Sequence, residues 1–451
     1  MPGSGELPST QERATVPRRD DDLVRLARED LRTLRKAPWF QEGRWSISPT
    51  NFLAETKAPL AVPPRVQLND ITGRVIEQMP GIALTVQEKV HLARALSDAG
   101  VPEMQPVQNI HLRRMREHVE GIRDAGLPIR LAVLCSTEDD LQVASASGAH
   151  VAEITIQGRP SLYSTYTGRR ATSNDELLKR GRHLIAVAKG LRLSARADIN
   201  DVGYSDIEYV RDFAKMAAEA GADSIYLADS SASLGPRAMG YLVGLVRSVA
   251  PGVPIGLHLH NDFNLAATVA ISALEAGAEI FDVSVNGVGE KAGQLDLAPF
   301  AVSVEAFYQV QTGIRLDRMY ELSKLVQDLS RIPIPPVFPV VGDRAFASAV
   351  MNVQMGEVYV DPYYLHSINP ECVGNRRDLP LGRHTREFGL LRKADELGYA
   401  LTIDQVPPAL EDLDDWFELH KRPITDSEVI RILKGRRAEL VRAASAAPAR
   451  Q

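Results

Sequence analysis

Cysteine is nearly absent from this chain, which has only Cys135 and Cys372 among its 451 residues. Two cysteines are too few for a disulfide framework, and they show no metal-binding spacing. The sequence also lacks an apolar run of the roughly 18 to 20 residues needed to span a bilayer. Its first residues lack the apolar core of a secretory signal. These absences argue against a membrane or secreted protein, so we expect a cytoplasmic one.

An excess of charge of one sign is missing as well. The net charge is only -6, and 44% of the residues are hydrophobic and 24% charged, which is ordinary for a soluble globular protein. Such a surface offers a polyanion nothing to bind, so nucleic acid is not an expected partner. The length exceeds the roughly 250 to 300 residues at which a single core stops growing. We therefore expect two structural units.

The chain begins with a segment unlike the rest. Residues 1 to about 20 are rich in proline, serine, glycine and charge, which predicts disorder. The stretch "DDDLVRLAREDLRTLRKA" then has apolar residues at helical spacing. We interpret residues 1–64 as a partly disordered leader with one helix.

From residue 65 short apolar runs alternate with helical patterns. The runs are "VQLND", "EMQPV", "IRLAVLC", "HVAEITI", "LRLSARAD", "SIYLAD", "PIGLHLH" and "IFDVSVN". Eight alternations over about 240 residues are typical of a (β/α)8 barrel, whereas an open doubly wound sheet more often has five or six. Several candidate helices end in Ala-Gly-Ala, where glycine suits a left-handed cap. We predict an α/β fold, a TIM barrel over residues 65–315.

Two further patterns argue against a nucleotide-binding sheet and indicate where the barrel ends. The first strand is followed by "DITGRVIEQMPG", which fits neither the dinucleotide fingerprint nor the Walker A loop. After residue 315 the pattern changes to a helix, a proline-rich break and short helices. We therefore predict a small, mainly helical C-terminal region over residues 316–445 and a disordered tail over 446–451.

Active sites of such barrels lie at the carboxyl ends of the strands. The polar residues there are Asp70, Arg74, Gln105, Asp198, Asp229, Ser230, His258, His260 and Asn286. Residues two apart in a strand share a face, so both imidazoles of "GLHLHND" point the same way.

Two imidazoles and the Asn286 amide oxygen suit a divalent ion such as Mn, Zn or Mg. Asp262 is placed to accept a hydrogen bond from one imidazole. The alternative is that backbone carbonyls or water satisfy the histidines and that Asn286 is a turn residue.

The segment "GLHLHNDFNLAATVAISALEAGAEIFDVSVNGVGEKAGQLDLAPF" resembles the one that identifies homocitrate synthases, isopropylmalate synthases and hydroxymethylglutaryl-CoA lyases, with its H-x-H-N-D and N-G-x-G-E-x-A-G motifs. The resemblance extends from about residue 66 to 435 and is closest to the acyl-transferring branch. It implies a metal-dependent barrel in which a 2-oxo acid chelates the ion and the enolate of an acyl-CoA attacks it. The thioester is then hydrolysed. The resemblance also implies a homodimer paired through the C-terminal region.

The first strand departs from the family pattern. Where the family has D-T-T-L-R-D-G-E-Q, this chain reads "DITGRVIEQ". The residues that it keeps are Asp70, Arg74, Glu77 and Gln78. Val75 replaces the metal-binding Asp and cannot coordinate, so we expect a weakened or lost metal unless Asp70 or a substrate carboxylate contributes. The resemblance implies that Arg74 polarises a carbonyl or stabilises an enolate oxygen. The alternative is a buried ion pair with a barrel carboxylate.

Other family positions have changed too. Ser348 and Val353 replace histidines of the C-terminal region, and "LCSTEDD" replaces an arginine that homocitrate synthases offer to the distal carboxylate of the oxo acid. Tyr163 stands where a substrate-contacting histidine is expected, and Ser230 replaces a threonine but keeps the hydroxyl.

These changes leave the general acid/base residue open. The candidates are Tyr163, Tyr166, Asp198, Glu290 and Lys291. As the catalytic set we predict Arg74, Glu77, Gln78, Tyr163, Ser230 and Glu290. The sequence supports an acyltransferase that condenses an acyl-CoA with a 2-oxo acid or an analogue. It leaves two alternatives, a metal-independent aldolase, lyase or hydrolase on the same barrel, and a non-catalytic binding paralogue.

Overall fold

The computed structural model describes residues 12–16, 21–58, 60–108, 112–161, 173–363 and 366–435. The candidates Tyr163 and Tyr166 and the predicted tail lie outside these residues. The chain divides into two compact units. We call Ile47–Asp343 with Cys372–Asn375 the barrel unit. The helical unit consists of Met1–Ser46, Arg344–Glu371 and Arg376–Gln451.

The barrel unit is built on eight parallel strands that close in the order β10-β3-β4-β5-β6-β7-β8-β9. The strands are β3 (Gln67–Asp70), β4 (Glu103–Met104), β5 (Arg130–Cys135), β6 (Val151–Gln157), β7 (Ser194–Asn200), β8 (Ser224–Asp229), β9 (Ile255–Leu259) and β10 (Ile280–Val283). Each of the eight predicted runs forms one strand, so the TIM barrel is confirmed.

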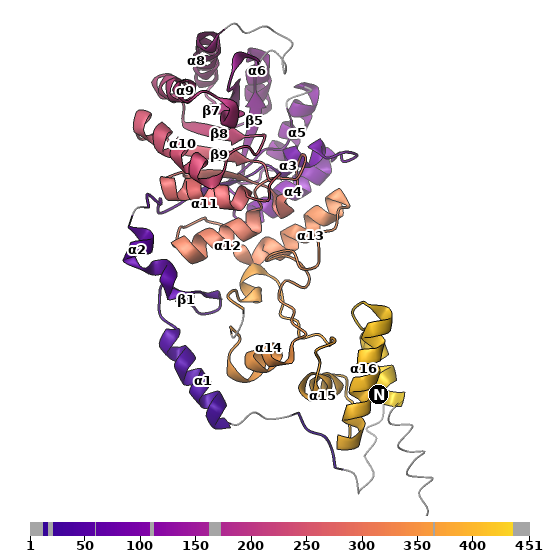
Figure 1. The fold of residues 1–451 in the computed structure, drawn as a ribbon. Coiled ribbons are helices and arrows are strands. Elements are labelled where there is room, and N and C mark those ends of the chain that lie inside the picture. The colour runs from indigo at the N-terminus through magenta and orange to yellow at the C-terminus, as the bar shows by residue number, and fades with distance from the viewer. Residues whose placement is uncertain are drawn as a thin grey trace, which may run out of the picture. The chain divides into compact units, whose positions relative to one another are not determined.

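Helices surround these strands, as Figure 1 shows. They are α4 (Val86–Asp98), α5 (Leu112–Asp124), α6 (Glu138–Ser147), α8 (Asn174–Gly190), α9 (Ile207–Glu219), α10 (Pro236–Val249), α11 (Ala266–Ala276), α12 (Leu297–Tyr308) and α13 (Met319–Ser330). A capping box of Thr85 and Glu88 begins α4. Gly277 ends α11 with a φ of 105°, which confirms the predicted left-handed glycine cap.

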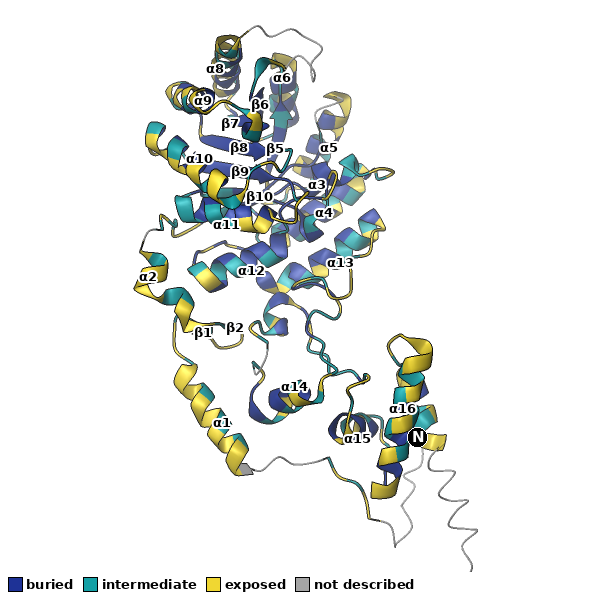
Figure 2. Cartoon of the chain, in the orientation of Figure 1, coloured by how far each residue is buried: buried dark blue, intermediate teal, exposed yellow. Residues whose placement is uncertain are grey.

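Polar side chains fill the middle of the barrel, where branched apolar residues are usual. The strand register pairs Asn69 with both Asp282 and Glu103, so these three side chains share the inner face. A Cβ on Gly256 would lie 2.0 Å from Cε2 of Tyr226. Glycine at this position therefore leaves room for the fully buried Tyr226 ring. Figure 2 shows the strands as the most deeply buried part of the unit.

The helical unit combines chain segments that precede the barrel with segments that follow it. Its helices are α1 (Asp21–Leu34), α14 (Met351–Met355), α15 (Glu387–Glu396) and α16 (Val406–His420), with a π-helical turn at Gly356–Val360 and a hairpin of β1 (Phe40–Gln41) and β2 (Trp45–Ser46). Ala14 donates its N–H to the carbonyl of Leu401 at 2.8 Å. Ala14 and Val16 pack against the apolar core between α15 and α16.

Two domain expectations differ from this division. The leader helix forms as predicted, but it belongs to the helical unit, where Arg28 donates to the carbonyl of Val360 at 3.3 Å. Helix α13 belongs to the barrel unit, so the units divide after Asp343 and not at residue 315. The reason is that α13 packs on α4 and on the turn after β10. No helix within the described residues has the length and apolarity to cross a membrane.

Candidate active site

The two histidines of "GLHLHND" lie side by side at the carboxyl end of β9. Their ring centroids are 5.4 Å apart and their planes meet at 72°. Both side chains are buried. The arrangement predicted from their spacing is therefore present.

His258 is oriented by a neighbouring strand. Its Nδ1 lies 3.1 Å from Oδ2 of Asp282 in β10. Burial, followed by the Arg74 charge, lowers the pKa of His258 to about 3, so the imidazole is neutral. An Nδ1–H donated to Asp282 leaves the Nε2 lone pair free for a ligand. The expectation that Asp262 has this role was wrong, because Asp262 pairs with Lys291 at 2.9 Å.

His260 is neutral for a similar reason. Burial, followed by the neighbouring His258, lowers its pKa to about 3. The amide nitrogen of Gln294 lies 3.2 Å from its Nε2 and 3.5 Å from its Nδ1. Gln294 therefore holds the ring in place from the loop after β10.

Asn286 offers an oxygen at the same end of the barrel. It follows β10 with a φ of 59°, a left-handed conformation that asparagine tolerates. Its Nδ2 donates to the carbonyl of Ser323 at 3.1 Å, while its buried Oδ1 has no partner. This acceptor is therefore available to a ligand or to water.

Val75 and Asp70 add no ligand to this set. Val75 is fully buried in the short helix α3 (Thr72–Val75). Asp70 accepts from the N–H of Thr72 at 2.9 Å and from its hydroxyl at 2.6 Å. Burial raises the pKa of Asp70 to about 7. Its carboxyl group is thus used to fix the turn after β3.

The donors that remain can still hold a metal. The described residues contain no group of three or more His, Cys, Asp or Glu side chains that could bind one. Two neutral imidazoles and the unpartnered amide oxygen of Asn286 do fit a divalent ion, because all three are accepted ligand types. This set carries no charge, so a substrate oxygen anion would have to supply it.

Arg74 is the buried cation of the site. Its side chain is 5% exposed, its Nη1 lies 3.4 Å from Oε1 of Gln108, and its Nε has no partner. Burial lowers the pKa of Arg74, although the carboxylates of Glu153 and Asp282 oppose this. No described carboxylate lies within ion-pair distance, so the alternative of a buried ion pair is not what the structure shows.

Asp198 is a buried carboxyl group on the inner face of the barrel. Residues alternate along β7, so Asp198 faces the interior one step above Arg196. It is 4% exposed and its Oδ1 has no partner. Burial, followed by Glu153 and Asp282, raises its pKa well above the ordinary aspartate value.

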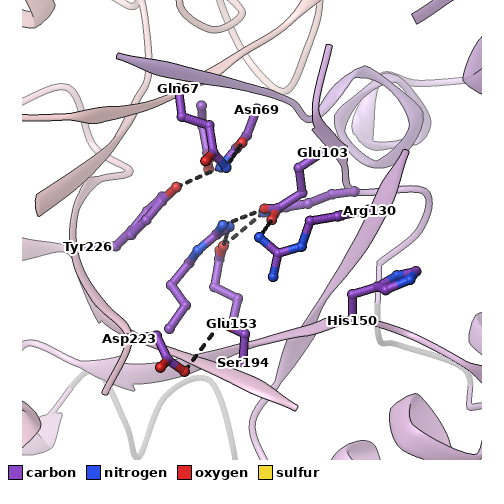
Figure 3. Close-up of polar contacts among 12 residues, drawn as sticks. Gln67, Asn69, Glu103, Arg130, His150, Glu153, Ser194, Asp223 and Tyr226 are labelled. Atoms are coloured by element: carbon purple, nitrogen blue, oxygen red, sulfur yellow. Dashed lines mark hydrogen bonds and ion pairs between the residues drawn. The ribbon is translucent and has the colours of Figure 1, made fainter. Parts of the chain in front are cut away.

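Beneath these groups the barrel holds a network of paired charges, which Figure 3 shows around Glu103, Glu153 and Tyr226. Arg196 donates to Oε2 of Glu153 at 2.8 Å and also pairs with Glu103. Its guanidinium lies 4.2 Å from the centre of the Tyr226 ring. The same Glu153 oxygen accepts from Nε2 of Gln105 at 2.8 Å. Gln105 is thereby held at the end of β4.

The remaining predicted residues lie around this centre or away from it. Glu77 accepts from Lys89 at 2.5 Å and from the N–H of Leu84 at 2.9 Å, contacts that stabilise the start of α4. Ser230 donates to Oδ1 of Asn200 at 2.7 Å. Glu290 is exposed, and Gln78 is half-buried.

Sequence reasoning missed Asp282, Gln294 and Glu153. A signal existed for two of them, because "HVAEITI" and "IFDVSVN" each place an acidic residue inside a buried strand. The register that sets Asp282 beside His258 could not be predicted from the runs alone. Gln294 lies in a loop, where no periodicity indicates a partner.

Comparison with known proteins gives this geometry a context. The chain is 29% identical over 391 residues to a homocitrate synthase from Methanothermobacter thermautotrophicus, which covers 87% of this chain and 98% of that protein. A 2-isopropylmalate synthase from Methanocaldococcus jannaschii is 32% identical over 348 residues, covering 76% of this chain and 66% of that protein. An (R)-citramalate synthase from the same organism is 28% identical over 380 residues, covering 83% and 76%.

Solved structures agree on the fold. The hydroxymethylglutaryl-CoA lyase of Bacillus subtilis superposes with a TM-score of 0.56 at 20% identity, covering 61% of this chain and 96% of that one. The lyase from Brucella melitensis gives 0.54 at 21% identity, covering 60% and 100%. The model of the HMGL-like family matches residues 65–326, more than half of the sequence. The resemblance found in the motifs is thus confirmed, and the chain belongs to the HMGL-like family.

Proposed function

We propose that this protein is an acyltransferase that forms a carbon–carbon bond between an acyl-CoA and a 2-oxo acid or a close analogue. The observation that carries the proposal is Arg74, a buried guanidinium without an ion-pair partner. It lies in the same unit as two neutral imidazoles and the unpartnered Asn286 oxygen. The named activities of the homocitrate, isopropylmalate and citramalate synthases support the same reaction.

Arg74 stabilises the negative charge that develops on oxygen in this reaction. A thioester that loses an α-proton places charge on its carbonyl oxygen, and attack on the oxo group places charge on a second oxygen. A buried cation with a free N–H stabilises such an oxygen strongly, because water does not screen it. Its charge is already desolvated, so no reorganisation is needed during the reaction.

Asp198 is the base that we propose for the first proton transfer. It takes the α-proton of the acyl group, the carbon of the enolate attacks the carbonyl carbon of the oxo acid, and the resulting alkoxide is protonated. Water then hydrolyses the thioester and CoA leaves. Of the other candidates, Lys291 donates to the carbonyl of Ser230 at 2.7 Å and to Asp262, and Glu290 is exposed.

A divalent ion fits this scheme at His258, His260 and Asn286. When bound, it would polarise the carbonyl of the oxo acid. Because Val75 supplies no charge, we propose that the ion binds weakly until the substrate carboxylate joins the ligand set.

The proposal is tested by measuring CoA release with a panel of acyl-CoAs and 2-oxo acids, and by exchange of the acyl α-protons with deuterated water. The Asp198→Asn variant should lose at least about 100-fold in exchange rate. Asp206→Asn, a change at an exposed aspartate, serves as the control. Absence of CoA release and exchange across the panel in the unmodified protein would refute the function. Exchange that survives in Asp198→Asn would refute only the role of Asp198.

A metal-independent reaction on the same barrel is the second candidate, and the buried Val75 favours it. It would use Arg74 and Asp198 for aldol, retro-aldol or hydrolytic chemistry. Activity indifferent to chelator in a preparation without bound Mn or Zn would select this candidate. Tight metabolite binding without turnover would instead identify a binding paralogue.

We also propose that the protein works in the cytoplasm as a homodimer. The support is the low cysteine content and the family resemblance. A monomeric mass in solution at micromolar concentration would contradict the dimer.

A further inference from the structure

The helical unit contains a cavity of its own. Its volume is about 490 Å³, within the range of small-molecule sites. Its lining residues lie between Arg344 and Val429, and the charged ones that matter here are Arg344, Arg377, Arg392, Lys393, Glu396 and Asp426. All of these residues belong to the helical unit, so none of the barrel residues described above contributes to the cavity.

Some of the charges in the cavity wall neutralise one another. Lys393 pairs with Glu396 at 3.1 Å and with Asp426 at 2.8 Å. Arg392 donates from Nη1 to the other oxygen of Glu396 at 3.2 Å. The acidic groups of the α15 side of the wall are therefore already paired.

The arginines, in contrast, keep donors without acceptors. Arg377 uses Nη1 on Glu357 at 2.9 Å, but its buried Nη2 has no partner. The buried Nε of Arg392 has none either. Within the described part of the chain, Arg344 makes no side-chain hydrogen bond or ion pair. Buried donors are almost always satisfied, so the two buried donors, together with the half-buried Arg344, favour an acceptor in the cavity that the chain does not provide.

We propose that this cavity is a binding site for a small organic acid, whose carboxylate or phosphate group is held by Arg344 and Arg377. Planar guanidinium groups match the oxygens of both anions and bind them in pairs of parallel hydrogen bonds. The apolar part of the wall, which includes Leu379, Pro380 and Ile424, accommodates a short carbon skeleton. The site is separate from the reaction proposed for the barrel and does not depend on it.

The test is titration calorimetry of the full chain with two probes, inorganic phosphate and succinate, at constant ionic strength. We expect one of them to bind with a Kd of about 1 mM or tighter. Arg344→Gln, which removes no structural contact, should weaken binding at least about tenfold. Arg377→Lys should weaken it as well, because a lysine that pairs with Glu357 has no counterpart of the unpartnered Nη2 of Arg377.

Arg383→Gln is the matched control. Arg383 lies in the same unit, is 56% exposed and pairs on the surface with Asp414 at 3.5 Å. Its variant should bind both probes as the unmodified protein does. Failure of both probes to bind would overturn the proposal, as would equal binding by Arg344→Gln and the unmodified protein. Preference between the probes decides between a phosphate and a carboxylate ligand.

Discussion

The middle and the mouth of the barrel use buried charge in opposite ways. In the middle, Arg196 pairs with both Glu103 and Glu153. At the mouth, Arg74 and Asp198 are as deeply buried, yet neither forms an ion pair with another described residue. Breaking a buried ion pair is costly because it leaves an uncompensated charge, whereas a buried ionisable group without an ion pair is open to contact with a ligand or water. Under the proposed function, the difference separates residues that hold the barrel together from residues that would act on a substrate.

Replacing Arg196 gives the largest expected effect on stability. Arg196→Met would leave two buried carboxylates without their shared cation, which costs about 3 to 5 kcal/mol. Urea unfolding measures the loss. The control is Arg182→Met, which breaks an exposed pair with Glu219 and should cost about 1 kcal/mol or less. Equal losses in the two variants would mean that the middle of the barrel is not stabilised by its network.

Replacing Arg74 should reverse this pattern. Arg74→Gln removes a buried charge that no carboxylate pairs with, so the free energy of unfolding should change by less than about 1 kcal/mol. The loss of oxyanion stabilisation should lower kcat/KM by about 100- to 1000-fold. If Arg74→Gln instead lowers the free energy of unfolding and leaves kcat/KM unchanged, Arg74 has a structural role like that of Arg196.

Restoring a charged ligand sharpens the contrast at the mouth. Val75→Asp adds the carboxylate that the neutral donor set lacks, so affinity for Mn²⁺ should rise at least about tenfold, which corresponds to about 1.4 kcal/mol. Without the ion the buried aspartate should lower the melting temperature. The control is Val75→Asn, which should gain little affinity. Equal Mn²⁺ binding in all three proteins would place the metal elsewhere.

Asp296 is another residue near the mouth of the barrel that has a buried carboxyl oxygen without a partner. Replacing it tests whether every such oxygen serves a ligand. Asp296 caps α12, with Oδ1 accepting from the N–H of Ala298 at 3.3 Å and its buried Oδ2 without a partner. Burial raises its pKa to about 7. The folded state therefore holds a proton that the unfolded state releases above pH 3.8, and stability falls as pH rises from there to about 7.

Asp296→Asn keeps a good cap and removes the ionisation. It should stabilise the protein by about 1 kcal/mol above pH 7, and this advantage should disappear below about pH 4. Melting temperatures at several pH values measure the difference, while turnover should be unchanged. A stabilisation independent of pH would show that the pKa of Asp296 is the same in the folded and unfolded states.

The order of elements was predictable because each buried parallel strand is a nearly continuous apolar run and each helix has a polar face. The pair His258 and His260 followed from the two-residue strand period. The partners of the two histidines could not be predicted in this way. His258 contacts Asp282, which lies 24 positions later in the sequence, and this contact depends on the register between two strands. The affiliation of α13 with the barrel likewise depends on which surface covers its apolar face, which periodicity does not specify.

The contact between residue 14 and residue 401 has a consequence for synthesis on the ribosome. The part of the helical unit near residue 14 contacts a segment that is translated almost 400 residues later. At ordinary elongation rates, this delay is about 20 to 80 seconds. The barrel strands between them are complete well before then. The contact between Ala14 and Leu401 can therefore form only after all eight barrel strands have been synthesised.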